Sequence, residues 1–184
     1  EVLLEAHQLN PDSAIILFNL GRNAQAAENY VNASDYYSQS VSIKPNFPEA
    51  HSNLALCFTQ LRLYTEAIAS HQRVLELRPG NMPDTCNLVT ALIGAGKSDE
   101  ALVYIQKALE RAPNDPLALR TMGNVLEARK DFSHAVLWYE KAISMDPRDP
   151  STYNNLAAVQ MRVKQLSLAK KNLLKALSLD PNHF

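Results

Sequence analysis

The sequence lacks a long apolar run, an excess of charge of one sign and a cluster of cysteines. Without about 20 consecutive apolar residues, no segment is predicted to insert into a membrane. Its 18 Lys and Arg against 19 Asp and Glu leave a formal net charge of -1, so the basic excess typical of nucleic-acid binding is missing. Cys57 and Cys86 match neither a metal-site spacing nor a disulfide framework. We expect two reduced thiols, as in a cytoplasmic or nucleocytoplasmic protein.

Motifs for catalysis or cofactor binding are also missing. None of the five histidines forms an HxxxH or HxxE pair, and neither cysteine has an obvious base partner. The stretch GAGKS at 94–98 ends like a phosphate-binding loop, but Ala91 stands where that motif requires a glycine. We therefore predict no catalytic residue, no metal and no cofactor.

What the sequence does contain is a repeat of fixed length. Six prolines and five alanines each recur at intervals of 34 residues, at Pro11, Pro45, Pro79, Pro113, Pro147 and Pro181 and at Ala33, Ala67, Ala101, Ala135 and Ala169. A fixed period of this length indicates stacked structural repeats. It predicts a single array over 1–184, with five full units at 14–47, 48–81, 82–115, 116–149 and 150–183 after a tail at 1–13.

Each unit contains two apolar stretches with helical spacing, separated by a short polar break. In the fourth unit, Leu119, Met122 and Leu126 lie on one face of the first stretch, and Ala135 and Tyr139 lie on one face of the second. The repeated proline follows the second stretch, where it cannot continue a helix. Each unit is therefore predicted to be a helix, a turn and a second helix.

The spacing of the small residues resembles the tetratricopeptide repeat. That motif has a small residue after a leucine in the first helix, then an alanine and a large residue in the second helix, and a closing proline. The small position reads Gly21, Ala55, Val89, Gly123 and Ala157. The resemblance implies an all-α fold, namely a right-handed superhelix (α-solenoid) of helix-turn-helix units. It also implies a non-catalytic protein–protein interaction scaffold.

Asparagines recur at the sixth position of the units. This asparagine ladder consists of Asn19, Asn53, Asn87 and Asn155, and Thr121 fills the skipped step. An asparagine inside a helix costs about half a kcal/mol relative to alanine, so its repeated use at one position suggests a purpose. A carboxamide carries a donor and an acceptor side by side and can pair with the backbone of an extended peptide.

The ladder resembles that of O-linked N-acetylglucosamine transferase and of some cargo-binding repeat proteins. The resemblance implies that these amides grip a partner peptide in a concave groove, with a gap at Thr121, whose hydroxyl is a poor two-sided partner. The alternative is that the asparagines bond to neighbouring helices or to water. Arg22, Arg120 and Arg162 are candidate readers of charge on the same peptide. Arg120, Asn124 and Asn155 also match the first steps of the two-carboxylate clamp of chaperone-binding repeats.

The predicted partner is therefore a protein or peptide, and neither nucleic acid nor membrane insertion is expected. Because the chain does not begin with Met, we expect a fragment of a longer protein. Besides membership of a transport or sorting complex, which no residue distinguishes, two alternatives stay open. The first is that the chain serves as the substrate-recognition arm of a larger enzyme, such as a glycosyltransferase. The second is a structural subunit that self-associates through the last helix, whose apolar stripe is Leu173, Leu174 and Leu177.

Overall fold

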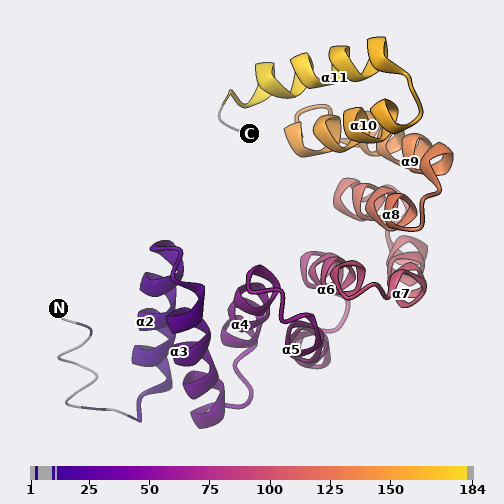
Figure 1. Ribbon diagram of the computed structural model, residues 1–184. Coiled ribbons are helices and arrows are strands. Elements are labelled where there is room, and N and C mark those ends of the chain that lie inside the picture. Colours follow the sequence, from indigo (N-terminus) through magenta and orange to yellow (C-terminus); the bar gives the residue numbers. More distant parts are fainter. Residues whose placement is uncertain (1–2, 4–9, 11, 182–184) are drawn as a thin grey trace. The chain divides into compact units, whose positions relative to one another are not determined.

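The computed structural model describes residues 3, 10 and 12–181, and the segment 12–181 contains ten α-helices and no β-strand (Figure 1). The first helices of the pairs are α2 (Ala14–Ala26), α4 (Pro48–Gln60), α6 (Met82–Gly94), α8 (Pro116–Ala128) and α10 (Pro150–Arg162). The second helices are α3 (Tyr30–Ile43), α5 (Tyr64–Leu77), α7 (Ser98–Arg111), α9 (Phe132–Met145) and α11 (Leu166–Leu179). The predicted all-α fold is confirmed, whereas most of the tail at 1–13 lies outside the described residues.

The chain forms two compact units, Glu1–Ala95 and Gly96–Phe184. The first compact unit holds α2 to α6 and the second holds α7 to α11. These two are the first unit and the second unit, and the 34-residue segments are the repeats. Within the described residues, no helix is long and apolar enough to cross a membrane.

Four of the five first helices begin at a polar side chain that caps them, and α4, which follows Phe47, is the exception. Asp115 accepts a hydrogen bond from the backbone N–H of Ala118 at 2.8 Å, and Pro116 occupies the first helical position, where its missing N–H is not needed. Asn81 caps α6 in the same way through the N–H of Asp84. The polar residues after the repeated prolines therefore start the next helix.

The turn inside each pair contains one residue with positive φ. These residues are Glu28, Arg62, Gly96, Lys130 and Lys164, again at intervals of 34. At Lys130, the following N–H of Asp131 donates to the Leu126 carbonyl at 2.8 Å, and Lys130 N–H donates to the Glu127 carbonyl at 2.9 Å. These two bonds satisfy carbonyls at the end of α8 in the manner of a Schellman motif. Gly96 alone among the five carries no Cβ to disfavour this conformation.

In two of the pairs, a glycine of the first helix lies against a tyrosine of the second. In the first unit, a Cβ on Gly21 would lie 2.6 Å from Cε1 of Tyr37. In the second unit, a Cβ on Gly123 would lie 2.6 Å from Cδ1 of Tyr139. Both tyrosine rings are fully buried. At Gly21 and Gly123 a glycine is therefore required, because an aromatic ring lies directly on the helix backbone.

Each unit has its own core beside this contact. Ala33, Tyr37, Leu54 and Cys57 form it in the first unit. The corresponding core of the second unit consists of Ala135, Tyr139, Leu156 and Val159. The last helix is less covered, since Leu174 and Leu177 are exposed and Leu173 is half-buried. Self-association through this stripe stays a prediction.

We expect Gly123→Ala to destabilise the second unit by roughly 1–3 kcal/mol, because the added methyl group overlaps the Tyr139 ring. Alanine would otherwise be favoured over glycine inside a helix by about 1 kcal/mol. Urea unfolding followed by circular dichroism measures the difference. Ser133→Ala, at an exposed position of α9, is the control and should change stability by less than about 0.5 kcal/mol. Unchanged or increased stability of Gly123→Ala would contradict the close approach.

Candidate functional site

Three members of the asparagine ladder belong to the first unit, and they have different hydrogen-bonding states. Asn53 Nδ2 donates to the Tyr37 hydroxyl at 3.2 Å, and that hydroxyl donates to Gln25 Oε1 at 2.8 Å. The side-chain amides of Asn19 and Asn87 make no hydrogen bond with any described residue, and both residues are half-buried. The amides of Asn19 and Asn87 therefore have neither their N–H donors nor their oxygen acceptor paired with a described residue.

The Tyr37 hydroxyl fixes the orientation of Asn53. The Tyr37 phenol is protonated at neutral pH, and burial raises its pKa further, to about 12. Its O–H donates a hydrogen bond to Gln25. Its oxygen can then only accept, and the group that donates to it is the Asn53 amide nitrogen. Asn53 Oδ1 is left without a partner among the described residues. The tyrosine thus anchors the amide while leaving its acceptor free.

The second unit repeats this arrangement with one additional residue. Asn155 Nδ2 donates to Asn124 Oδ1 at 3.0 Å, and the Tyr139 hydroxyl donates to the same oxygen at 2.7 Å. Tyr139 also lies 3.2 Å from Glu127 Oε2, and its burial raises its pKa. Asn155 is therefore held through its nitrogen, as Asn53 is.

Thr121 is turned away from the ladder. Its hydroxyl donates to the Leu117 carbonyl one turn earlier at 2.7 Å, and the residue is only 3% exposed. Thr121 also differs from Asn53 and Asn155 in the residue that precedes it by 16 positions. Asn53 and Asn155 each follow a buried tyrosine by 16 residues, whereas Thr121 follows Ile105 at that distance, and isoleucine offers no polar group.

The three predicted arginines also differ in their surroundings. Arg120 Nη1 lies 2.8 Å from Asp149 Oδ2, in a half-buried ion pair. Arg162 Nε lies 3.6 Å from Glu127 Oε1, and its guanidinium lies 5.5 Å from the centre of the Phe132 ring. Arg120, Asn124 and Asn155, the three residues of the predicted clamp, each have a partner within the unit.

Arg22 differs from these two arginines. It is exposed and makes no hydrogen bond or ion pair with the described residues. Its positive charge lies close enough to Tyr37 to oppose slightly the rise in that residue's pKa. The unpaired guanidinium of Arg22 and the unpaired side-chain amide of Asn19 therefore lie on the same helix, α2.

A buried histidine stands on α5 where Tyr37 stands on α3. His71 is 1% exposed, and neither ring nitrogen has a hydrogen-bond partner among the described residues. Burial lowers its pKa from 6.5 to about 4, partly opposed by the carboxylate of Asp84. Asp84 is itself held by the Ser52 hydroxyl at 3.0 Å and by Arg78 Nη2 at 3.4 Å.

Nothing in the described part of the chain resembles a catalytic or metal centre. No three His, Cys, Asp or Glu side chains among these residues are grouped to hold a metal ion. Both cysteines are buried, and burial raises the pKa of Cys57 to about 11, which disfavours the reactive thiolate.

Family models match most of the chain. Models of the tetratricopeptide repeat match residues 11–81, 86–115 and 150–183, and a model described as TPR repeat matches residues 123–163. The chain belongs to the tetratricopeptide repeat family. Members of this family mediate protein–protein interactions.

Curated relatives share this repeat over part of their length. Sperm-associated antigen 1 of Rattus norvegicus is 30% identical over 105 residues, which are 57% of this chain and 12% of that protein. UDP-N-acetylglucosamine--peptide N-acetylglucosaminyltransferase of Giardia intestinalis is 24% identical over 127 residues, 69% of this chain and 8% of that protein. Hsp70-Hsp90 organizing protein 2 of Arabidopsis thaliana is 27% identical over 88 residues, 48% of this chain and 15% of that protein. The chain therefore spans a small part of these relatives.

Solved structures of repeat proteins are similar over nearly the whole chain. A thermophilic TPR protein of Thermus thermophilus has a TM-score of 0.79 and 20% identity, covering 93% of this chain and 93% of that chain. YrrB, described as a TPR protein with an unusual peptide-binding site, has a TM-score of 0.64 and 21% identity, covering 100% and 94%. At these identities the similarity shows the fold.

The structure gives four residues a role that the sequence analysis did not assign to them. Gln25, Tyr37, Tyr139 and Glu127 orient the amides without being members of the ladder. The constant separation of 16 residues between a second-helix tyrosine and the next asparagine is the pattern that could have revealed the two tyrosines.

We expect the stability of the first unit to fall by about 3 kcal/mol between pH 6.5 and pH 4 through His71 alone. The unfolded chain binds a proton near pH 6.5, whereas the folded chain binds it only near pH 4. Acid therefore favours the unfolded state between these values, and the contribution is fully present above pH 6.5.

The measurement is urea unfolding at several pH values, with His71→Leu as the comparison, since the fifth repeat has Leu173 at this position. The variant should lack this part of the pH dependence. Parallel loss of stability in both proteins would show that His71 does not titrate as described.

Proposed function

We propose that this chain binds an extended segment of a partner protein along its first helices, with the asparagine ladder contacting the peptide backbone. The observation that carries the proposal is the recurrence of an amide at one repeat position with unused hydrogen-bonding groups. Buried or half-buried polar groups usually find partners, so open amides at a repeated position suggest a partner outside the chain.

Within the proposal, the ladder residues have two roles. Asn19 and Asn87 present both N–H and C=O groups, which matches the paired groups of an extended backbone. Asn53 and Asn155 are held through Nδ2 and present Oδ1 as an acceptor for a peptide N–H. Because the tyrosine network already holds these two amides, less conformational entropy is lost on binding. Thr121 makes the gap, since its hydroxyl is used inside α8.

The arginines supply charge selection in this proposal. Arg22 has no ion-pair partner among the described residues and can meet a carboxylate of the peptide directly. Arg120 and Arg162 would have to exchange Asp149 and Glu127 for such a carboxylate, and the surroundings of Asn124 would change with them. A mainly neutral peptide with an acidic residue near Arg22 fits this arrangement best.

In this proposal the chain catalyses no reaction and forms one continuous array of repeats. Its location is cytoplasmic or nucleocytoplasmic. A second candidate is that the chain selects substrates for an enzyme encoded in the same protein. The match to the Giardia intestinalis transferase over 69% of this chain favours it. Sequencing the complete reading frame tests it: a glycosyltransferase domain would support this candidate, and a complete frame without any enzyme domain would exclude it.

We expect the double variant Asn19→Ala, Asn87→Ala to bind peptides retained from a random library about 10- to 100-fold more weakly than the parent. Each lost hydrogen bond contributes about 0.5–1.5 kcal/mol, so the loss of one bond at each of the two amides corresponds to about 1–3 kcal/mol. Fluorescence anisotropy of a labelled retained peptide measures the change.

Asn32→Ala is the matched control, because Asn32 is an exposed amide on a second helix, α3. It should leave the affinity unchanged, and all variants should keep the parent's helical content. If the double variant binds as tightly as the parent, the ladder does not contact the peptide.

A further inference from the structure

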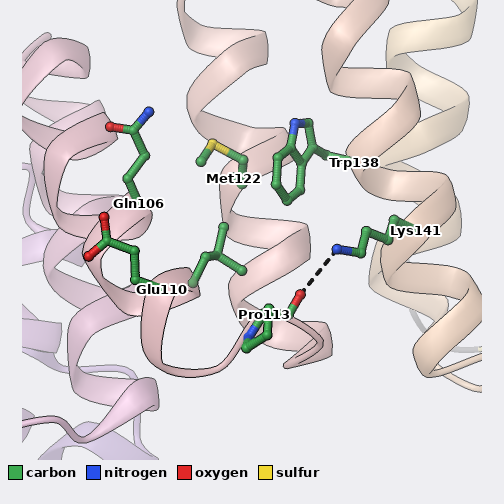
Figure 2. A pocket seen from close by; sticks show the side chains of 7 residues that line it. Gln106, Glu110, Pro113, Met122, Trp138 and Lys141 are labelled. Carbon is green, nitrogen blue, oxygen red and sulfur yellow. Dashed lines mark hydrogen bonds between the residues drawn. The ribbon is translucent and has the colours of Figure 1, made fainter.

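A hollow of about 520 Å³ lies in the second unit between two successive second helices (Figure 2). Its walls are α7 and α9, and α8 forms its floor. The side chains used below are Gln106, Leu109, Glu110, Met122, Trp138 and Lys141. No member of the asparagine ladder lines it, so this surface is separate from the peptide-binding site proposed above.

The floor of the hollow is apolar. Leu109 and Met122 are almost buried, at 8% and 4% exposure, and only their tips reach the hollow. Trp138 is half-buried, and in Figure 2 its indole lies beside Met122, opposite Gln106 and Glu110. A volume of this size lined by a tryptophan and two aliphatic side chains suits a large apolar side chain.

The rim carries two charges, and only the negative one has no hydrogen-bond or ion-pair partner among the described residues. Lys141 Nζ donates to the Pro113 carbonyl at 3.1 Å and lies 5.5 Å from the centre of the Trp138 ring, so its charge already has partners (Figure 2). Glu110 and Gln106 are exposed and make no hydrogen bond or ion pair with the described residues. A ligand that enters the hollow beside Glu110 is therefore favoured if it brings a basic group.

The hollow recurs one repeat later. A second hollow of about 340 Å³ lies between α9 and α11, with α10 as its floor. Shifting the first set of residues by 34 leads from Leu109 to Ile143, from Met122 to Leu156, from Gln106 to Glu140 and from Trp138 to Asn172, all of which line the second hollow. Both hollows have an apolar floor and a glutamate on the earlier of the two helices. The repeat therefore places a second, smaller hollow beside the first, but the two linings differ. Ser144 stands at the repeat position of Glu110, Asn172 stands at that of Trp138, and Lys171 also lines the second hollow.

We propose that these second-helix hollows form a docking surface for a partner protein segment with large apolar side chains adjacent to Lys or Arg. One apolar side chain inserts over Met122 and against Trp138, and the neighbouring basic group pairs with Glu110. A second apolar side chain of the same segment enters the hollow over Leu156, beside Glu140. The chain would thus hold two partner segments on two surfaces.

The test uses the single tryptophan of the chain as a reporter. The indole N–H signal of Trp138 is followed by NMR during titration with a synthetic peptide that carries two leucines, each followed by an arginine. A twin peptide has glutamates in place of the arginines. We expect the arginine peptide to shift the indole signal and the glutamate peptide to need an about fivefold to tenfold higher concentration for the same shift.

The variant Glu110→Gln removes the charge at an exposed position and should reduce this preference to about twofold. Glu100→Gln, on the same helix but outside the hollow, should keep the full preference. Equal responses to both peptides, or an unchanged preference in Glu110→Gln, would overturn the proposal. So would a shift of the ladder amides without the indole, which would assign the peptide to the first-helix side. A shift of the indole with protein concentration alone would instead identify a second copy as the occupant and overturn it too.

Discussion

The close approach of an aromatic ring to a glycine backbone is the constraint on which the described arrangement depends. Tyr37 lies on Gly21 in the first unit, and Tyr139 lies on Gly123 in the second. A side chain at either glycine would push the helices apart. Because the rings are buried between the helices, their hydroxyls emerge beside polar residues of the first helices and have to be satisfied there. The packing of the pair and the orientation of the ladder therefore share one cause.

This shared cause links stability to recognition. The tyrosine hydroxyls hold Asn53 directly and Asn155 through Asn124, so that rigid second helices position groups on the first-helix surface. Where the tyrosine is replaced, the link is lost. The repeat with Ile105 is followed by Thr121, whose hydroxyl is bonded within its own helix. The repeat with His71 has a buried ring without partners among the described residues, and the following Asn87 is open.

The period of 34 residues predicted the helix pairs, the position of their turns and the need for small residues, because these follow from local spacing. It did not predict which amides are occupied. Whether the Asn53 amide has a partner depends on a hydroxyl of the preceding second helix. Whether the Arg120 guanidinium has one depends in the same way on Asp149, which caps α10. The hollow at Trp138 was also missed, because its depth depends on how far α7 and α9 stand apart over Met122.

The central claim is that the asparagine ladder contacts a partner backbone while the tyrosines hold part of it in place. The most direct measurement is NMR of the side-chain amide groups with and without a peptide retained from a random library. The account predicts that the NH₂ signals of Asn19 and Asn87 shift most, with smaller shifts at Asn53 and Asn155, whose nitrogens already have partners. Bound peptide that leaves all four amide signals unchanged would contradict it.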